Sequence, residues 1–449
     1  MLDPSDKETE DNALAGASPY NAKANKKIVD EVEKHDWIKT PVQFGEICLS
    51  IGDPNDFVDV WDAAIPNDKF TTFQWVCLYS FQGKQHANRL PVGDAAICMT
   101  FPIKAADPPK KAPPLFYLSL PEKRSAGKKP ALEHPTGFRF ITNDRGSGNK
   151  RDISYWEPIA PAGYRSLGIC FNRNEPDREK YWCVREDLCV ATDQEKIWQE
   201  RGWKGNGSLY VPKAAPNIWE TIPNGQLVIS PLAYSHDDVT PFLLRLPLAF
   251  LDIKSFDFPG PKKPEEDPSI VVNHNLPAGL SPVIIVPYTA IAADKKNLKN
   301  QPYESPFYFI AAQPYYRCFN VFSPTGGGQQ TLTYRVGVTR EESETFEKST
   351  SITTGIDVGA YLDGPFGNAS FSMTSTFSLT LHKGRTDETV LEFTETLEFP
   401  ETARVWQWQL FTDIVVTRSN GTQLRPIAYM NQDRVNIPPP VESEPDDGS

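Results

Sequence analysis

The chain has 449 residues, of which 39% are hydrophobic and 23% are charged, and its formal net charge is −12. This length is enough for two or three domains with hydrophobic cores, and the acidic balance argues against a nucleic-acid-binding protein, which needs a basic surface. The 41 prolines, with many Thr, Tyr, Phe and Val residues, favour strands and loops over helices.

Residues 1–37 form a polar N-terminal extension with one predicted short helix in NKKIVDEVEKHDW. Neither this extension nor any later stretch has the apolar run of a secretory signal or of a spanning helix. We therefore expect a protein that is made in soluble form without a signal peptide. The seven cysteines include no CxxC pair and are expected to be buried free thiols, although their spacing leaves a Cys183–Cys189 disulfide open.

Three tryptophans mark an internal repeat in residues 38–256. Trp61, Trp156 and Trp219 are each followed by an acidic residue, by a proline within a few positions, by a turn pair and then by a strand-like run. Such recurrence predicts three similar sheets around a common axis, and the turn pair Ala162-Gly163 supports a strand reversal. Chance recurrence in a segment rich in Trp and Pro is the alternative.

The second repeat carries a more specific signal. YWEPIAPAGYRSLGICF, followed by YWCVREDLC, resembles the vacuolar-sorting β-prism family of plants and fungi. The matching residues are Trp156, Pro158, Pro161, Gly163, Tyr164, Leu167, Gly168, Cys183, Val184, Arg185, Asp187 and Leu188. The resemblance implies a three-sheet β-prism over residues 38–256 whose loop tips present a site for a sugar or a lipid headgroup. It does not identify the ligand.

A second β-domain is predicted for residues 270–437. Residues 257–269 are rich in proline and charge, so they cannot bury apolar surface and are predicted to be a linker. Long strands are predicted in QTLTYRVGVTREESETFEKSTSITTG, ETVLEFTETLEF and ARVWQWQLFTDIVVTRSNG. Residues 438–449 are expected to be a disordered acidic tail.

Residues 351–381 contain two alternating arms around a GPFGN break. Each arm has one apolar and one small-polar face, and each is at least as long as the roughly 9 to 11 residues that a tilted strand needs to cross a bilayer. No charged residue lies on the apolar faces, where it would cost about 2 to 4 kcal/mol at the midplane. The predicted membrane-facing residues are Ile352, Ile356, Val358, Leu362, Phe366, Phe371, Met373, Phe377, Leu379 and Leu381. The predicted pore-lumen residues are Thr353, Asp357, Tyr361, Asp363, Ser372, Thr374, Thr376 and Ser378.

An ordinary half-buried hairpin would alternate in the same way. Its solvent face usually carries long charged side chains, however, whereas this face carries Ser, Thr, Gly and two Asp residues. A single inserted hairpin would leave open edges in hydrocarbon, where each unpaired backbone group costs several kcal/mol. One hairpin per chain therefore predicts a homo-oligomer that closes a shared barrel.

The order of a Ser/Thr-rich hairpin, flanking Thr-rich strands and a WQWQLFTDIVV strand resembles the aerolysin, epsilon-toxin and mosquitocidal-toxin family of β-pore formers. The resemblance implies an elongated β-sandwich domain with an insertion hairpin, with Phe366 at the tip that leads into the bilayer, and activation by proteolysis. With the prism, it implies an all-β insecticidal toxin that is released to the outside, binds a glycan or lipid on the target-cell membrane and oligomerises.

No enzyme signature occurs in the sequence. HExxH, GxSxG, a P-loop and Cys/His spacing for zinc are all missing, so no catalytic residue, metal or cofactor is expected. The alternative function is a non-lytic lectin-like or lipid-sorting binding protein with a static second β-domain. A hydrolase with an unrecognised site has little support.

Overall fold

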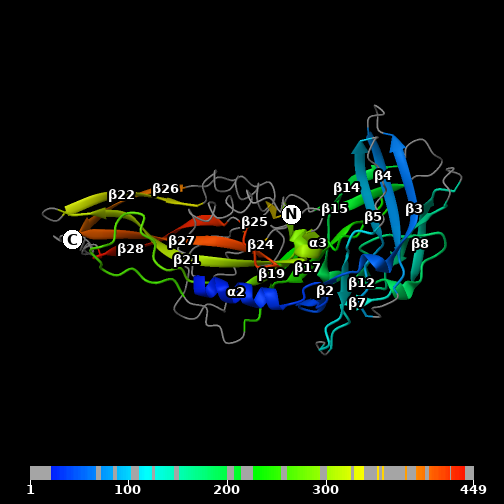
Figure 1. Ribbon diagram of the computed structural model, residues 1–449, viewed down its shortest axis with the longest axis horizontal. Helices are drawn as coiled ribbons and strands as arrows, with labels where there is room; N and C mark the ends of the chain where they lie inside the picture. Colours follow the sequence, from blue (N-terminus) through cyan, green and yellow to red (C-terminus); the bar gives the residue numbers. More distant parts are fainter. Residues whose placement is uncertain are drawn as a thin grey trace, which may run out of the picture.

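The computed structural model describes residues 22–66, 72–83, 88–102, 111–123, 127–145, 151–199, 207–213, 226–253, 260–293, 301–324, 328–337, 351–352, 356–357, 380–381, 391–399, 404–424 and 426–439. Strands dominate these residues, which confirms the predicted all-β class. The molecule is elongated, with short N-terminal strands at one end and long C-terminal strands at the other (Figure 1). No helix in this part of the chain is long and apolar enough to cross a membrane.

Short antiparallel strands build the N-terminal half. They are β1 (Val42–Phe44), β2 (Ile47–Ile51), β3 (Phe57–Pro66), β4 (Thr72–Phe81), β5 (Ala95–Pro102), β6 (Phe116–Ser119), β7 (Leu132–Glu133), β8 (Gly137–Asn143), β9 (Ser154–Ile159), β10 (Tyr164–Arg165), β11 (Cys170–Asn172), β12 (Cys183–Arg185), β13 (Cys189–Ala191), β14 (Asp193–Gln199), β15 (Ser208–Lys213), β16 (Gln226–Ile229) and β17 (Phe242–Pro247). Their sheets have the orders β1-β2-β6, β3-β4-β5, β11-β9-β8 and β10-β12-β7, and β14 pairs with β15.

Two of the three predicted tryptophan repeats have the same strand arrangement. The strand of Trp61 (β3) pairs with β4, and the strand of Trp156 (β9) pairs with β11, so each lies beside the run that follows it. Trp61 is buried and donates from Nε1 to Oδ2 of Asp144 (2.5 Å), whereas Trp156 is half-buried and donates to the carbonyl of Asn172 (3.0 Å). Trp219 lies outside the described residues, so the third repeat stays a prediction.

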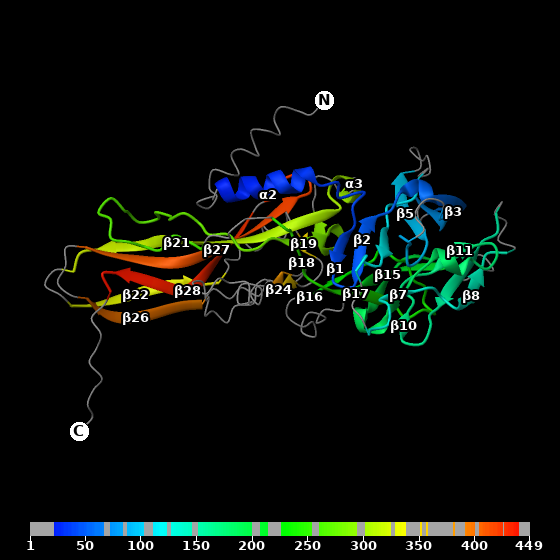
Figure 2. The ribbon, with the colours of Figure 1, turned by 90° about the horizontal axis from the view of Figure 1, so that it is seen from below.

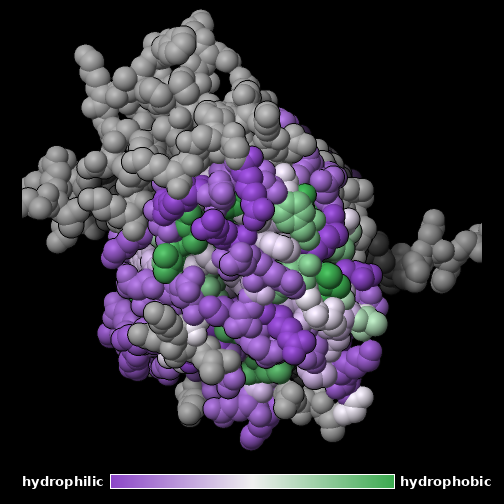
Figure 3. Space-filling view, turned by 90° about the vertical axis from the view of Figure 1, so that its right-hand side faces the viewer, coloured by the Kyte–Doolittle hydropathy of each residue, from purple (hydrophilic) through white to green (hydrophobic). Residues whose placement is uncertain are grey.

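The outer end of the N-terminal half is mainly polar. Figure 3 shows small separate groups of hydrophobic residues among hydrophilic ones on this face. Exposed apolar residues of the N-terminal strands include Val58, Phe140 and Ile159, and the ring of Phe140 packs edge-on against Trp156 (5.5 Å between centroids). Isolated apolar side chains are ordinary on protein surfaces, so we assign no site to them.

Long strands build the C-terminal half. Its elements are β18 (Ala249–Phe250), β19 (Ile284–Pro287), β20 (Ile291–Ala293), α3 (Gln301–Glu304), β21 (Phe307–Phe322), β22 (Gly328–Val336), β23 (Ser351–Ile352), β24 (Ile356–Asp357), β25 (Thr380–Leu381), β26 (Leu391–Phe399), β27 (Val405–Arg418) and β28 (Ile427–Ile437). The order β18-β19-β21-β27-β28 forms what we call the main sheet, and β22 with β26 forms what we call the ribbon. All of β27 is buried, so the main sheet is covered on both faces.

The predicted N-terminal helix is confirmed as α2 (Ala22–Lys34). It lies on the side of the main sheet opposite to the ribbon (Figures 1 and 2). Ile28 and Val32 are buried at the contact, and the ring of Trp37 packs against Phe309 with 4.8 Å between centroids. The N-terminal extension is therefore part of the fold from Ala22 onward, which its polar composition did not indicate.

One hydrophobic cluster joins the two halves of the chain. It includes Phe44 and Phe116 from the N-terminal sheets, Leu244 from β17, and Phe307 and Ile414 from the main sheet. Residues 260–269 are mostly exposed, as predicted for a linker, yet the core continues from one half into the other. The domain boundaries stay a prediction, and the shared core makes a hinge motion between whole halves costly.

All seven cysteines are free, and five of them are buried. Cys183 and Cys189, for which the sequence left a disulfide open, are not bridged. Burial raises the pKa of both thiols to about 12, so they stay protonated and unreactive near neutral pH.

Candidate functional site

The ribbon brings together the two ends of the predicted insertion segment. β22 and β26 pair antiparallel from Gly328 opposite Phe399 to Val336 opposite Leu391. The chain that leaves β22 after Val336 returns to β26 at Leu391, and residues 351–381 lie within that connection. The start of the strand predicted before the insertion segment is present as β22, the strand predicted after it is present as β26, and the two are direct neighbours.

The ribbon has one polar and one apolar face. On the exposed face the hydroxyls of Thr331 and Thr396 lie 3.2 Å apart and those of Thr333 and Thr394 lie 3.3 Å apart. On the other face Leu332 is buried and the rings of Tyr334 and Phe393 stack. This alternation resembles the one that the sequence predicts for the arms, although the residues between the ribbon and the arms are rich in charge.

Polar contacts attach one half of the ribbon to the main sheet. Arg434 of β28 forms an ion pair with Glu395 of β26 (Nη2 to Oε2, 2.7 Å), and its guanidinium lies 3.7 Å from the ring centroid of Tyr334. Gln409 of β27 donates from Nε2 to the carbonyl of Arg335 (2.6 Å). A backbone bridge joins Gly337 to Met430 through hydrogen bonds of 2.9 and 3.0 Å.

Apolar packing attaches the other half of the ribbon. Leu332 and Phe399 of the ribbon form a small cluster with Val405 at the start of β27. Each polar contact contributes about 0.5 to 1.5 kcal/mol net, because water replaces it on release, whereas a fully buried large apolar side chain contributes about 1.5 to 3 kcal/mol. The two kinds of contact overlap along the ribbon, because Leu332 lies opposite Glu395 and Tyr334, beside the ion pair, is itself buried.

The ends of the two predicted arms lie side by side. Ile356 of β24 pairs with Leu381 of β25, and Asp357 pairs with Thr380. This antiparallel pairing is what a hairpin over residues 351–381 requires. The predicted site residues Thr353, Val358, Tyr361, Leu362, Asp363, Phe366, Phe371, Ser372, Met373, Thr374, Thr376, Phe377, Ser378 and Leu379 lie outside the described residues.

The first arm is docked on other strands of the chain. Ile356 pairs with Leu227 of β16, which adds β24 and β25 to a sheet of the order β13-β17-β16-β24-β25. Ser351 and Ile352 of β23 pair with Ala293 and Ile291 of β20. The start of the insertion segment thus uses its backbone hydrogen bonds within the chain, which satisfies these groups while the arms are not in a membrane.

The residues of the β-prism motif build a rigid loop support. Arg185 donates from Nε to Asp187 (2.6 Å), from Nη2 to Glu46 (2.5 Å) and from Nη1 to the carbonyl of Lys129 (2.6 Å). The guanidinium beside Asp187 holds the pKa of that carboxyl below its ordinary value. Tyr164 donates its hydroxyl to the carbonyl of Pro130 (2.8 Å).

The turn expected at Ala162-Gly163 is present. Gly163 has a φ of +87°, in the left-handed region that favours glycine. The N–H of Tyr164 donates to the carbonyl of Pro161 (3.0 Å), and the N–H of Glu186 donates to the carbonyl of Gly163 (3.0 Å). The motif residues therefore connect β10 to β12, and their described contacts are structural.

A buried carboxylate joins β4, β11 and the segment before β12 in the core of the N-terminal half. Asp94 is fully buried and accepts hydrogen bonds from the N–H groups of Phe81 (2.8 Å) and Phe171 (2.7 Å) and from the hydroxyl of Tyr181 (2.8 Å). Desolvation outweighs these donors and raises the pKa of Asp94 to about 7. These hydrogen bonds tie Asp94 to segments far apart in the chain, so we assign it a structural role.

His236, Asp237 and Asp238 are the group of described residues that could offer metal ligands. His236 Nδ1 lies 2.5 Å from Oδ1 of Asp237, and that oxygen also accepts a hydrogen bond from Ser208 (3.1 Å). Both aspartates are exposed. Hydrogen bonds within the group account for this arrangement, so we assign no metal to it.

Sequence reasoning missed the residues that hold the ribbon. Glu395 and Arg434 sit in strands whose alternation was visible, but 39 residues separate them in the chain. It also missed a basic run, PEKRSAGKKP at residues 121–130, which stands out in an acidic chain and was the available signal for a second site.

Comparison with known proteins bears on the N-terminal half. Residues 103–228 match the model of the family of vacuolar protein sorting-associated protein 62, which confirms the resemblance drawn from the second repeat. A search of curated proteins finds no match to the chain.

Solved structures with some similarity include GNIP1Aa from Chromobacterium piscinae (TM-score 0.28, 19% identity, 42% of this chain and 32% of that one). They also include Cry35Ab1 (TM-score 0.29, 9% identity, 89% and 91%) and the hemolytic lectin CEL-III (TM-score 0.16, 12% identity, 92% and 95%). The chain thus spans about a third of the length of the GNIP1Aa structure. We draw no functional argument from likenesses at these TM-scores.

Proposed function

We propose that this protein is a non-enzymatic pore-forming toxin, insecticidal in its target, that inserts residues 351–381 into the target-cell membrane as part of a β-barrel. The observation that carries the proposal is the ribbon: two paired strands flank, on both sides in the chain, an alternating segment whose apolar faces carry no charge. An ordinary static hairpin does not need a polar, separable attachment of its base, and the contacts of Arg434 and Gln409 supply one.

The proposal requires several copies of the chain. Each chain contributes two strands, and the edges of a lone hairpin would leave backbone groups unpaired in hydrocarbon. Pairing of neighbouring chains removes those edges, so insertion and oligomerisation occur together. In the barrel the predicted apolar residues, such as Val358 and Phe377, face lipid and the predicted polar residues, such as Thr374, face water.

The deciding experiment measures leakage and assembly together. Protease-treated protein is added to liposomes that contain a self-quenched dye, and the same sample is imaged by electron microscopy. Dye release with ring-shaped oligomers is the expected result. Protein that binds the liposomes but neither assembles nor releases dye would refute the pore.

One observation favours the alternative of a non-lytic lectin-like or lipid-sorting protein. The family match covers residues 103–228 and none of the ribbon, so binding without insertion would explain that part of the chain. Under this alternative, a covalent lock on residues 351–381 leaves every measurable activity unchanged. Under the pore proposal, the same lock removes leakage and preserves binding.

A further inference from the structure

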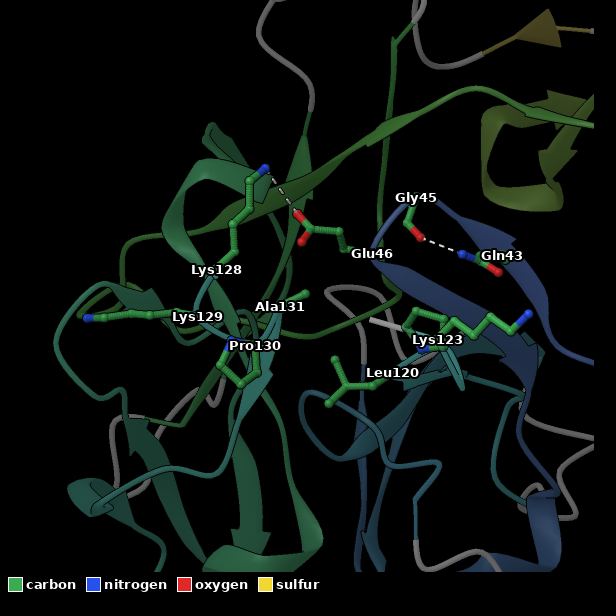
Figure 4. A pocket seen from close by; sticks show the side chains of 10 residues that line it. Gln43, Gly45, Glu46, Leu120, Lys123, Lys128, Lys129, Pro130 and Ala131 are labelled. Atoms are coloured by element: carbon green, nitrogen blue, oxygen red, sulfur yellow. Dashed lines mark hydrogen bonds and ion pairs between the residues drawn. The ribbon is translucent and has the colours of Figure 1, made fainter. Parts of the chain in front are cut away.

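A pocket of about 330 Å³ opens between the β1–β2 turn and the segment that follows β6. Figure 4 shows its lining: Glu46 comes from the turn, and Lys123, Lys128 and Lys129 come from the basic run. The lining therefore has three lysines and one glutamate in a chain whose net charge is −12. The pocket thus has a local excess of basic side chains in an acidic chain.

Two of the three lysines have no acidic partner among the described residues. In the described parts of the chain no carboxylate lies within ion-pair distance of the ammonium of Lys123 or Lys129. Lys128 lies 3.8 Å from Glu46, but the same carboxylate oxygen is 2.5 Å from Arg185, so Arg185 is its main partner. Their side chains point away from the pocket (Figure 4), so the two ammonium groups reach an anion in it by rotating inward.

The floor between the lysines is apolar. Leu120, Pro121, Pro130 and Ala131 line it, and Ala131 is almost completely buried. A free inorganic ion gains nothing from such a floor, whereas an anion that carries an apolar group gains from both parts. The combination of a cationic rim and an apolar floor favours an amphiphilic anion.

The backbone that presents the lysines is held in place. Arg185 donates to the carbonyl of Lys129, Tyr164 donates to the carbonyl of Pro130, and the N–H of Arg185 donates to the carbonyl of Ala131 (2.9 Å). These contacts fix the loop at three successive residues. Little backbone order is therefore lost when a ligand binds, which preserves affinity.

We propose that this pocket binds the phosphate of an anionic phospholipid headgroup, and the proposal rests on the function above for its choice of a membrane as the target. Lys123 and Lys129 extend outward on opposite sides of the pocket (Figure 4). Lysine is a compact point charge on a flexible stem, so both ammonium groups turn inward to one phosphate. The glycerol end of the headgroup lies on Leu120 and Pro130.

The experiment is flotation of the full-length chain with lipid vesicles, which reports binding without leakage. Vesicles of phosphatidylcholine alone are compared with vesicles of phosphatidylcholine and phosphatidic acid. The test variant carries Lys123→Gln and Lys129→Gln. The matched control carries Lys262→Gln and Lys263→Gln, which removes the same charge from an exposed segment outside the pocket.

We expect the test variant to bind the anionic vesicles about thirtyfold more weakly than the wild type, at about 1 kcal/mol per lysine near an anionic surface. For the control, the logarithm of the fold-change in vesicle binding should be less than a fifth of that of the test variant. Equal losses in both variants would show general attraction to charge and overturn the site. Circular dichroism and the urea midpoint confirm that both variants fold.

Two further measurements identify the source of the anion. Lysine-dependent binding of inorganic phosphate in calorimetry, without binding to vesicles, would assign a soluble phosphate compound and overturn the lipid headgroup. Lysine-dependent retention on heparin without flotation would assign an anionic glycan and overturn it as well. Flotation that depends on the lysines in a protein that never releases dye would support this site and refute the pore instead.

Discussion

A disulfide between β20 and β23 should hold the insertion segment in its docked position. Ala293 and Ser351 are opposite each other in the antiparallel pair, where Cα atoms lie about 4.5 to 5.5 Å apart, within the range that a disulfide spans. Ala293→Cys and Ser351→Cys are both small changes in volume. The bond closes a loop of about 59 residues and stabilises the docked state by about 4 kcal/mol.

The lock also limits how far the arm can travel. In an inserted hairpin that continues the ribbon, Ser351 would lie beyond Val336 by about 50 Å, at about 3.3 Å for each extended residue. A disulfide instead keeps its Cα within about 7 Å of residue 293. Insertion with the bond intact would therefore require β20 to leave its place together with the arm.

The assay is dye release from liposomes before and after reduction with dithiothreitol. The oxidised double variant should release no dye, and the reduced protein should regain the rate of the wild type. Each single cysteine variant controls for oxidation of the seven native thiols, and mass spectrometry after proteolysis confirms the bond. Equal leakage by oxidised and reduced protein would refute the reasoning, because the segment would then act without leaving β20.

Three other predictions test the arms, the ribbon contact and the core. Val358→Lys should abolish dye release, because a charge on the predicted lipid face costs about 2 to 4 kcal/mol per chain in the bilayer. Thr374→Lys, on the predicted lumen face, should retain dye release. Leakage by both variants would show that the arms form a static sheet. Arg434→Gln leaves Glu395 without its ion pair, so urea titration should show a loss of about 1 to 3 kcal/mol in the free energy of unfolding. Dye release by this variant should become faster. An unchanged rate of release would show that the ribbon does not open at this contact. Burial raises the pKa of Asp94 from 3.8 to about 7, so the folded state binds this proton more tightly than the unfolded chain. Its contribution to stability is present below pH 3.8 and is lost as the pH rises through about 7, by on the order of 4 kcal/mol. Asp94→Asn should remove that part of the pH dependence of the unfolding midpoint, and an unchanged slope would assign it to other groups.

Local pattern was enough to predict individual elements. The helix that contains Val32, the strand of Trp61 with its following partner, and the long strand WQWQLFTDIVV all follow from periodicity and turn signals in short windows. The ribbon strands were predicted by their Thr-rich alternation. Each of these predictions needed only residues close together in the chain.

Long-range pairing was not predictable in the same way. Alternation shows which face of a strand is apolar, but not which strand covers that face, so the ion pair of Arg434 with Glu395 left no local trace. The contact of α2 with the main sheet also depended on a few apolar residues, such as Ile28 and Val32, in a polar helix. The basic run around Lys128 was visible in the sequence, but only the fold shows that it forms one wall of a pocket.

The register of the arms differs from that of the ribbon, and the difference bears on how one sequence could serve two states. Twenty residues separate Val336 from Ile356 on the first side, whereas ten separate Leu381 from Leu391 on the second. A hairpin that continued the ribbon register would place Ile356 opposite residue 371 instead of Leu381. The two registers differ by ten residues, the distance from residue 371 to Leu381. Because ten is even, every side chain would keep its face of the sheet through the change, whereas an odd difference would turn the apolar side chains toward the lumen. The docked arms and the proposed barrel strands can therefore share one alternating pattern, and insertion requires a slide along the ladder rather than a change in which residues face outward.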